Sequence, residues 1–598
     1  MSGQCVDIIS YDTTSTLSEL FAARVARSGD RVGTKYFDKN KHIWRSLSWQ
    51  QLGDRSARIQ AVIRGQALQQ GEKIAIMACN SPWWLCAEQA ALGLGLVVVP
   101  LFVNDRGENA AYIIDHAEAK ILFIDGHEQW KLLQDVADKI ADVTLISFER
   151  FEPGSSKLSI QFLDDLLPET APELEVYHGQ RDELATIVYT SGTTGRPKGV
   201  MLSHDNILWN VSRSLDAVRI YTHDLFLSFL PLSHMFERTA GHYLVISAGA
   251  TIAYVRSIPH LREDLQTIRP TVLIAVPRIY ERIYNTMQEK LLNGSPMQCK
   301  MVDFAINIGW QFFQWQQRRA SWQPRFLLIP LVRLLISSKI MANLGGRLRL
   351  SISGGAPLSE KVAQTFIGLG LPLLQGYGLT ETSPVMCVNR INHNRPETVG
   401  PVLNDVEVKT SEIGELITRG PGVMLGYWKN EEATREVIDE NGWFKTGDLA
   451  KIEDDYVRIT GRVKEIIVLA NGEKVPPADM ELSIITDPLF EQAMVIGEGK
   501  PFLSALLVLS REQWLHFVKS SGLSEQDALH DHHVEQQIVR RLAESLSAFP
   551  GYAQIRRVWL TLTPWTIDEG LLTPTLKLRR KQINERFHNE LEHLYEGR

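Results

Sequence analysis

The feature that most limits the possible folds is a regular alternation of β-branched runs with helical stretches between Lys73 and Phe148. The runs are KIAIMAC, LVVVPLF, KILFID and VTLISF. A helical stretch such as SPWWLCAEQAALGLG separates two of them, with Ser81 placed to cap it and Pro82 suited to its first turn. Strands that alternate with helices in this way predict a parallel sheet with helices packed on it.

The same alternation returns further along the chain in the runs LFLSFLPL, ATIAYV, PTVLIAVP and RLRLSISGG, so a second α/β unit is expected. After Thr398, shorter strand-like pieces with turn signals predict a smaller β-rich subdomain. From about Glu465, strands mix with helices such as HHVEQQIVRRLAESL. The expected fold class is therefore α/β: a large N-terminal body of two α/β sheet units plus a β-rich subdomain, followed by a small α+β C-terminal domain.

Length and composition exclude several classes of protein. The 598 residues are enough for several domains with sizeable cores, and a formal net charge of -7 offers no electrostatic reason to bind nucleic acid. The five scattered cysteines form no CxxC pair and no spacing typical of a zinc site, so a reduced, cytosolic protein is expected.

The N-terminus does not resemble a signal peptide. The longest uninterrupted apolar stretch, Ala90 to Val103, is too short to span a bilayer, so no transmembrane helix is expected.

The most informative stretch for function is YTSGTTGRPKGV, residues 189–200. Its glycines let backbone N–H groups approach phosphate oxygens, its hydroxyls add donors and its lysine supplies positive charge. The residues expected to bind phosphate are Thr190, Ser191, Gly192, Thr193, Thr194, Gly195 and Lys198. The spacing differs from the Walker A pattern, so an ordinary P-loop NTPase is disfavoured. The alternative is a polar hairpin loop between the runs LATIVYT and VMLSH.

Further motifs follow this loop along the chain. They are SISGGAPLS (351–359), QGYGLTETSP (375–384), GWFKTGDLA (442–450), GRVKEIIVLANGEKVPP (461–477) and LTPTLKLRR (572–580). Together with the loop, and in this order, they resemble the signature motifs of the adenylate-forming superfamily of acyl-CoA synthetases, acid-CoA ligases and luciferases. The stretch PRIYERIYN (277–285) and the extra segment around 295–344 are similar to its long-chain fatty acyl-CoA synthetase branch.

The resemblance implies a nucleotide site built from the later motifs. Tyr377 would lie against the adenine ring, Thr380 would contact the α-phosphate, and Glu381 would hold Mg²⁺, which prefers carboxylate and phosphate oxygens. Asp448 and Arg462 would bind the ribose hydroxyls. The other nucleotide-binding residues that the resemblance implies are Gly355, Ala356, Pro357, Gln375, Gly376 and Gly378. Taken alone, GYG is typical of a turn, and the three charged residues are typical of solvated surface positions.

The resemblance also implies how the chain is divided. Lys464 corresponds to the hinge of the family, about which the small domain rotates. The implied domains are therefore a large ATP- and acyl-binding domain, residues 1–463, and a small mobile domain, residues 464–598. The residues alone allow a simpler interpretation of Lys464, as an exposed lysine at the start of a strand.

Two more residues of the C-terminal part complete the implied site. Lys577 in TLKLRR matches the mobile lysine of the family, although Thr575 and Leu576 replace the commoner Ser-Gly before it. Gly472 would face the pantetheine tunnel, because a glycine lets the backbone approach a thin ligand closely. The simpler interpretations are a solvated helix face for the basic cluster that follows Lys577 and an Asn-Gly hairpin turn for Gly472.

The implied reaction is activation of a long-chain fatty acid to acyl-AMP, followed by thioester formation with coenzyme A and release of AMP and pyrophosphate. ATP, Mg²⁺ and coenzyme A are the implied cofactors. The implied catalytic residues are Lys198, Thr380, Glu381 and Lys577. Such chemistry needs fixed cations where charge develops on phosphoryl oxygens, and it needs no protein nucleophile.

Three alternatives stay open. The first is a fatty-acyl-AMP ligase that delivers its product to a carrier protein, the second is a catalytically inactive nucleotide-binding protein, and the third is luciferase-like oxidation.

A further open point is His234 in PLSHMFERT. It matches a histidine that the family often places beside the acyl site, and a purely structural histidine is the simpler interpretation.

The segment from Gly309 to Met341 combines tryptophans with arginines. They are Trp310, Trp315, Trp322, Arg318, Arg319, Arg325 and Arg333. An amphipathic surface at a bilayer interface would have this composition, and so would a helical pair packed on the large domain. A cytoplasmic location is expected, with peripheral contact at the inner membrane surface and a homodimer as further expectations.

Overall fold

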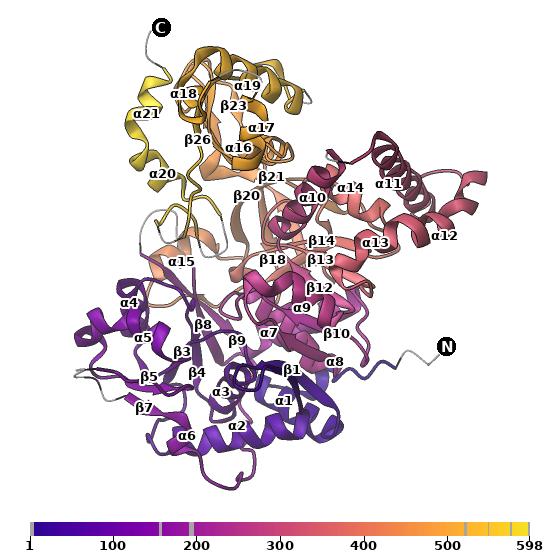
Figure 1. Ribbon diagram of the computed structural model, residues 1–598. Coiled ribbons are helices and arrows are strands. Elements are labelled where there is room, and N and C mark those ends of the chain that lie inside the picture. The colour runs from indigo at the N-terminus through magenta and orange to yellow at the C-terminus, as the bar shows by residue number, and fades with distance from the viewer. Residues whose placement is uncertain are drawn as a thin grey trace.

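In the computed structural model, the chain forms a large N-terminal body and a smaller C-terminal part, whose yellow ribbon lies at the top of Figure 1. The structure describes residues 5–154, 158, 160–190, 196–292, 294–519, 523–547, 549–567, 569–573 and 577–595. Within these residues the body contains two eight-stranded sheets and a five-stranded sheet, and the C-terminal part contains a two-stranded and a three-stranded sheet. The predicted α/β class, with two sheet units, a β-rich subdomain and a small C-terminal α+β part, is confirmed.

The first eight-stranded sheet contains the alternating strands that follow Lys73, and its strand order is β19-β9-β8-β4-β3-β5-β6-β7. The strands are β3 (Lys73–Met77), β4 (Val97–Pro100), β5 (Ala119–Ile124), β6 (Thr144–Ser147), β7 (Ile160–Phe162), β8 (Leu184–Thr190), β9 (Lys198–Ser203) and β19 (Gly426–Tyr427). Along β3, Ile74 and Ile76 join one hydrophobic core, whereas Ala75 and Met77 join another. Since successive side chains point to opposite faces, both faces of this parallel sheet are covered.

Helices connect the parallel strands of this sheet. They are α3 (Pro82–Gly93), α4 (Gly107–Ala117), α5 (His127–Leu133) with the 3-10 helix η2 (Gln134–Ile140), and α6 (Leu163–Leu166). Helix α3 begins as predicted, because the Ser81 hydroxyl accepts a hydrogen bond from the backbone N–H of Trp84 and Pro82 occupies the first turn. The apolar stretch from Ala90 to Val103 is the buried end of α3 followed by β4.

The second eight-stranded sheet has the order β15-β14-β13-β12-β10-β11-β1-β2. Its strands are β1 (Val32–Asp38), β2 (Ile43–Ser48), β10 (Leu225–Ser228), β11 (Thr251–Tyr254), β12 (Val272–Ala275), β13 (Leu350–Ser353), β14 (Leu373–Gly378) and β15 (Val385–Val388). Strand β1 pairs in parallel with β11, with Thr34 opposite Ile252. The sequence analysis did not predict this pairing, which joins the start of the chain to the second sheet unit.

The second sheet unit also contains α-helices, 3-10 helices and a π-helix. They are η1 (Tyr11–Thr13), α1 (Leu17–Ser28), α2 (Trp49–Arg64), α7 (His204–Ala217), the π-helix η3 (Glu237–Tyr243), α8 (Leu244–Ala248), η4 (Ile258–His260), α9 (Leu261–Ile268), α10 (Pro277–Leu292), α14 (Glu360–Gly368) and η8 (Thr380–Thr382). A Ser203 hydroxyl caps α7 by accepting from Asn206 N–H, and the Asn206 side chain accepts from Ser203 N–H in return.

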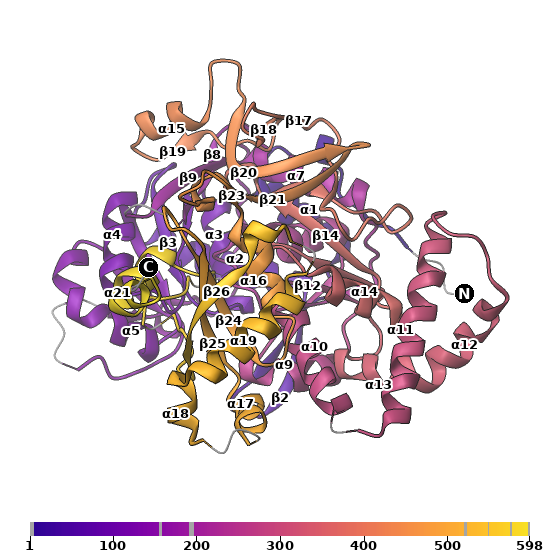
Figure 2. The ribbon, with the colours of Figure 1, turned by 90° about the horizontal axis from the view of Figure 1, so that it is seen from above.

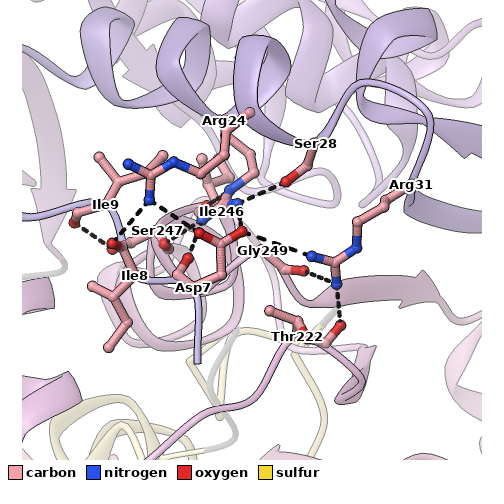
Figure 3. A network of polar contacts seen from close by, with 11 residues as sticks. Asp7, Ile8, Ile9, Arg24, Ser28, Arg31, Thr222, Ile246, Ser247 and Gly249 are labelled. Carbon is pink, nitrogen blue, oxygen red and sulfur yellow. Dashed lines mark hydrogen bonds and ion pairs between the residues drawn. The ribbon is translucent and has the colours of Figure 1, made fainter. Parts of the chain in front are cut away.

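The N-terminal segment is fixed to the second unit by a buried arginine, shown in Figure 3. Arg24 of α1 forms a 2.9 Å ion pair with Asp7 and donates to the carbonyl oxygens of Ile246 and Ser247. Its guanidinium also lies against Gly249, where an added Cβ would come within 2.6 Å of it. Gly249 has a φ of 65°, so a glycine is favoured there by conformation as well as by space.

The β-rich subdomain has the order β16-β21-β20-β18-β17 and closes the body. Its elements are β16 (Gly400–Pro401), β17 (Glu407–Thr410), β18 (Glu415–Arg419), α15 (Glu431–Val437), β20 (Phe444–Glu453) and β21 (Tyr456–Arg462). The predicted boundary at residue 464 falls in the 3-10 helix η9 (Val463–Glu465), directly after β21. Its role as a hinge stays a prediction.

The C-terminal part has its own core around β25, whose residues are buried along its length. Its elements are β22 (Ile467–Val468), β23 (Lys474–Val475), α16 (Pro477–Ile484), β24 (Phe490–Ile496), β25 (Leu503–Leu509), α17 (Arg511–Val518), α18 (Glu525–His530), α19 (His532–Ser545), η10 (Gly551–Ala553), β26 (Ile555–Thr561), α20 (Arg580–Arg586) and α21 (His588–His593). Strand β25 pairs antiparallel with β24 and parallel with β26.

A helical lobe projects from one side of the body in both ribbon views (Figures 1 and 2). It consists of α11 (Pro296–Gln316), η5 (Pro324–Leu328), α12 (Ile329–Val332), the π-helix η6 (Arg333–Ser337), α13 (Ser338–Met341) and η7 (Ala342–Leu344). By length and composition, the helical stretch Pro324–Leu344 is apolar enough to cross a membrane. Most of this stretch belongs to the segment Gly309–Met341 noted above, and it contains no long uninterrupted apolar run because Arg325, Arg333 and Lys339 interrupt it.

Candidate active site

A cavity of about 3080 Å³ lies between the body and the C-terminal part and is lined by residues of both. Most predicted site residues that the structure describes line it: Thr190, Lys198, Gly355, Ala356, Pro357, Gln375, Gly376, Tyr377, Gly378, Thr380, Glu381, Asp448, Arg462, Lys464 and Lys577. The predicted phosphate-binding residues Ser191, Gly192, Thr193, Thr194 and Gly195 lie outside the described residues. Segments far apart in the sequence therefore meet at one site, and the role of each residue stays a prediction.

The strands on either side of the predicted phosphate-binding loop form a hairpin. Strands β8 and β9 pair antiparallel, with Thr190 opposite Lys198 and Tyr189 opposite Gly199. This agrees with the simpler interpretation of the stretch as a hairpin, and its described residues Thr190 and Lys198 line the cavity. The ammonium of Lys198 lies 4.9 Å from the ring centre of Tyr427, a residue of β19 that the sequence analysis did not identify.

Glu381 is a half-buried carboxylate on η8, at the end of the QGYGLTETSP motif. Tyr427 donates a 3.0 Å hydrogen bond to its Oε1. Burial raises the pKa of Glu381, while the Tyr427 hydrogen bond and the charge of Arg462 oppose that effect. Among the described side chains, none forms an ion pair with Glu381, so the carboxylate is available to a bound cation.

Asp448 and Arg462 form a fixed pair with Tyr377. They lie opposite each other in the ladder between β20 and β21, and their side chains form a 3.0 Å ion pair. The Tyr377 hydroxyl donates a 2.6 Å hydrogen bond to the other Asp448 oxygen. Burial and the adjacent carboxylate hold the pKa of Tyr377 well above its usual range, so the phenol keeps its proton. Two residues predicted to bind ribose and one predicted to bind adenine are thus in direct contact.

Lys577 lies in the cavity with its ammonium near the predicted nucleotide residues of the body. Burial and, to a smaller extent, the positive charge of Arg462 lower the pKa of Lys577 to about 8, while Asp448 and Glu381 oppose this shift. No carboxylate in the described part of the chain forms an ion pair with it. A half-buried ammonium without a counter-charge is costly, so this position favours an anionic ligand.

Two glycines of the site are required by backbone geometry. Gly355 follows β13 and has a φ of 81°, which places it in the left-handed region. At Gly378, an added Cβ would lie 1.7 Å from the Pro384 carbonyl oxygen. These glycines therefore shape the wall of the cavity beside Thr380.

Gly472 is the one described residue of the predicted set that does not line the cavity in this arrangement. It lies in the exposed turn between β22 and β23 with a φ of 84°. Its Asn-Gly turn is sufficient to explain the glycine. Lys464 is exposed, as its simpler interpretation predicts, and it lies at the rim of the cavity in η9.

An apolar branch extends the cavity between the π-helix η3 and the second sheet. Its lining includes Ile220, Phe226, Phe229, Phe236, Ala240, Leu244, Val272 and Ile274. The sequence analysis missed these residues, because they come from separate strands and helices and form no local motif. An apolar lining of this kind is suited to a hydrocarbon chain.

The three histidines near the motifs have different surroundings. His234 lines the cavity, where burial and, to a smaller extent, the charge of Lys577 lower its pKa to about 4. Its Nδ1 accepts a 3.2 Å hydrogen bond from Phe236 N–H, so the proton of the neutral ring is on Nε2. His204 accepts from Leu17 N–H and His242 contacts Glu88, so these two are structural.

A fully buried network fixes the π-helix that lines the apolar branch. We define the Glu88 network as Glu88 of α3 with Arg238, His242 and Tyr243 of η3. Arg238 forms a 2.7 Å ion pair with Glu88, the Tyr243 hydroxyl donates to the same oxygen at 2.5 Å, and His242 lies 2.7 Å from the other. Because α3 belongs to the first sheet unit and η3 to the second, the network joins the two units beneath the cavity.

Comparison with known proteins agrees with this geometry. The profile of the AMP-binding enzyme family matches residues 21–428, and that of the AMP-binding enzyme C-terminal domain matches residues 464–598. The chain belongs to the AMP-binding enzyme family. The resemblance to the adenylate-forming superfamily and its long-chain acyl-CoA synthetase branch is thereby confirmed.

Relatives of this AMP-binding enzyme extend over most of its length. It is 31% identical to the long-chain-fatty-acid–CoA ligase FadD15 of Mycobacterium tuberculosis over 88% of each chain. It is 26% identical to the human long-chain-fatty-acid–CoA ligase ACSBG2 over 98% of this chain and 93% of the relative. The adenylation domain of a carboxylate reductase from Mycobacterium chelonae has the same fold, with a TM-score of 0.77 and 23% identity over 97% of this chain and 91% of that chain.

The depressed pKa of Lys577 predicts an alkaline limit for ATP use by this AMP-binding enzyme. The ammonium form prevails below pH 8 and is lost above it, so kcat/KM for ATP is expected to fall as the pH rises through about 8. Lys577→Arg should move this decline, the alkaline limb of the pH profile, above the pH range in which the enzyme can be assayed, since arginine stays protonated. Lys445→Arg, at an exposed lysine of the cavity rim, should keep the limb. An unchanged limb in Lys577→Arg would contradict the assignment.

Removal of the charge at Glu88 should destabilise the fold. Glu88→Gln leaves Arg238 buried without a counter-charge, which is expected to lower the free energy of unfolding by about 3–5 kcal/mol. The control Glu118→Gln removes an exposed partner of Lys429 and should cost less than about 1 kcal/mol. Denaturant midpoints of the two variants measure the difference. Equal midpoints would mean that the Glu88 network does not hold the two units together.

Proposed function

We propose that this AMP-binding enzyme activates a long-chain fatty acid with ATP and then transfers the acyl group to coenzyme A. The observation that supports this most directly is that the residues of the apolar branch line the same cavity as Glu381 and Lys577. A fatty acid in that branch would present its carboxylate to a cluster of polar residues. The relatives named as long-chain-fatty-acid–CoA ligases support the same substrate class.

Binding of the two substrates follows from the shape and polarity of the cavity. Asp448 is fixed as an acceptor for the ribose hydroxyls, with Arg462 as a donor beside it. The aromatic face of Tyr377 supplies a surface for adenine. The apolar branch holds the alkyl chain, since each methylene buried contributes about 0.8 kcal/mol. Binding therefore aligns the carboxylate with the α-phosphate.

In the first half-reaction, a carboxylate oxygen of the fatty acid forms a bond to the α-phosphorus, and the bond from that phosphorus to the bridging oxygen breaks. The departing pyrophosphate leaves with the electron pair. Lys577 and Lys198 supply fixed positive charge close to the oxygens on which charge develops. A carboxylate, rather than a protein nucleophile, performs the attack.

The surroundings of Glu381 fit a magnesium ion. It is a carboxylate without an ion-pair partner in the described structure, and hard cations of this kind bind one or two carboxylates together with substrate phosphates. When bound, the ion would neutralise charge on the phosphate oxygens. Tyr427 would keep the Glu381 carboxylate oriented through its 3.0 Å hydrogen bond.

In the second half-reaction, the thiol sulfur of coenzyme A forms a bond to the acyl carbonyl carbon, and AMP leaves with the electron pair of the broken bond. The thiol proton passes to the departing phosphate or to water. Lys577 occupies the space beside the predicted nucleotide residues in the present arrangement. We propose that rotation about Lys464 withdraws it and brings Gly472 toward the cavity. Exposure of both residues is compatible with such a motion.

We propose the cytoplasm as the location of the enzyme. All five cysteines are free, which is typical of a reducing compartment. Peripheral membrane contact and a homodimer are expectations about partners that the reaction itself does not require.

Substrate class is tested by a series of saturated acids from acetate to stearate with ATP and free coenzyme A. The expected kcat/KM rises about 4-fold per added methylene until the apolar branch is full. Ala240→Phe, which fills part of that branch, should depress the rates for long acids and leave acetate unchanged. A flat profile in the wild type would contradict the proposal, and product formation only with an acyl carrier protein would favour the fatty-acyl-AMP ligase alternative.

The role of Lys577 is tested by separating the two half-reactions. Lys577→Ala should lower fatty-acid-dependent pyrophosphate exchange by about 10²–10³-fold, because one fixed charge on the developing oxyanion is lost. Thioester formation from a pre-formed acyl adenylate should be largely retained. Equal loss in both assays would mean that Lys577 is not specific to adenylation, and wild-type enzyme without pyrophosphate exchange would favour an inactive nucleotide-binding protein.

A further inference from the structure

The helical lobe consists of two packed layers, helix α11 and the stretch Pro324–Leu344, with a small hydrophobic core between them. One face of the stretch Pro324–Leu344 packs on α11, where Phe326, Ile329 and Val332 contact Ala305 and Ile308. Helix α11 in turn packs on α14 of the body. The predicted helical pair on the large domain is therefore present, and this packing uses only one side of the stretch.

The opposite side of the stretch is apolar as well. We define the leucine face as Leu327, Leu328, Leu331, Leu334 and Leu335, whose exposed fractions range from 44% to 75%. Trp322, just before the stretch, is 51% exposed. A helix that is apolar on all sides is normally covered by protein or by lipid. An exposed patch of this kind marks an interaction site, since no described segment of the chain covers the leucine face.

The charge around the leucine face indicates what covers it. Residues 304–359 contain seven basic side chains and no acidic one, in a chain with an overall charge of -7. Within the described structure, none of the following forms an ion pair with a carboxylate: Arg318, Arg325, Arg333, Lys339 and Arg347. Unneutralised cations beside an apolar face are complementary to anionic lipid headgroups.

The same charges argue against two other arrangements. A symmetric dimer through the leucine face would bring Arg325, Arg333 and Lys339 of two copies together, and like charges repel. A transmembrane orientation would bury Arg333 at the middle of the stretch and would separate Phe326, Ile329 and Val332 from α11. A helix lying in the plane of the interface avoids both costs.

We propose that the leucine face inserts into the interfacial region of an anionic lipid bilayer, with the helical stretch parallel to the membrane plane. Leucine side chains enter the acyl region, Trp322 lies at the headgroup level, and the arginines and Lys339 contact lipid phosphates. This docking depends on the surface of the lobe and is independent of the reaction in the cavity.

The test is flotation of the full-length protein with two kinds of vesicle, phosphatidylcholine alone and phosphatidylcholine mixed with phosphatidylglycerol. The wild type should float with the anionic vesicles and much less with the neutral ones, and added salt should weaken the binding. Leu331→Ser combined with Leu334→Ser should weaken binding to the anionic vesicles at least ~10-fold. Arg325→Gln and Lys339→Gln should each weaken it by about 5-fold.

Matched controls use exposed residues outside the lobe. Ile413→Ser removes an apolar side chain that is 63% exposed, and Arg435→Gln removes an exposed positive charge; neither should change flotation. Wild-type protein that stays soluble with both vesicles, or a leucine variant that floats normally, would overturn the proposal. So would resistance of the membrane-bound protein to carbonate extraction, which indicates a spanning helix. Concentration-dependent dimers that Leu331→Ser and Leu334→Ser abolish, without vesicle binding, would assign the face to self-association.

Discussion

Two half-buried charged side chains that have no ion-pair partner among the described residues line the cavity of this AMP-binding enzyme. Lys577 from the C-terminal part and Glu381 from the body both line it, and neither forms an ion pair with a side chain that the structure describes. Leaving such charges unpaired in a low-dielectric cleft is expensive. A magnesium-bound triphosphate carries charge of both signs, so one ligand would satisfy both residues.

The rest of the structure holds these charges in place. The β20–β21 ladder fixes Asp448 opposite Arg462, and the Tyr377 hydroxyl connects that pair to β14. On the other side, the Glu88 network joins the two sheet units beneath the apolar branch. The helical lobe packs on the body through α11 and α14. It follows α10, which lines the cavity with Tyr284 and Gln288, so a docked lobe would hold the acyl site near the bilayer.

Local patterns predicted much of this arrangement from the sequence. Alternating β-branched runs predicted the parallel strands β3 to β6, and the glycine-rich motifs predicted many of the polar residues that line the cavity. Contacts between distant segments were not predictable in the same way. The pairing of β1 with β11 and the lining of the apolar branch depend on tertiary packing, and no local spacing encodes them. Gly472 is the opposite case. Its sequence motif is recognisable, but in the present arrangement of the body and the C-terminal part the residue lies outside the cavity.

The most direct measurement of the central claim is a crystal structure with a hydrolysis-resistant analogue of a long-chain acyl adenylate. We expect its phosphate-like group between Lys577 and Thr380, its ribose on Asp448, and its alkyl chain along Phe226, Phe229 and Leu244. An analogue bound outside this cavity, or an alkyl chain directed into solvent while the apolar branch stays closed, would contradict the account.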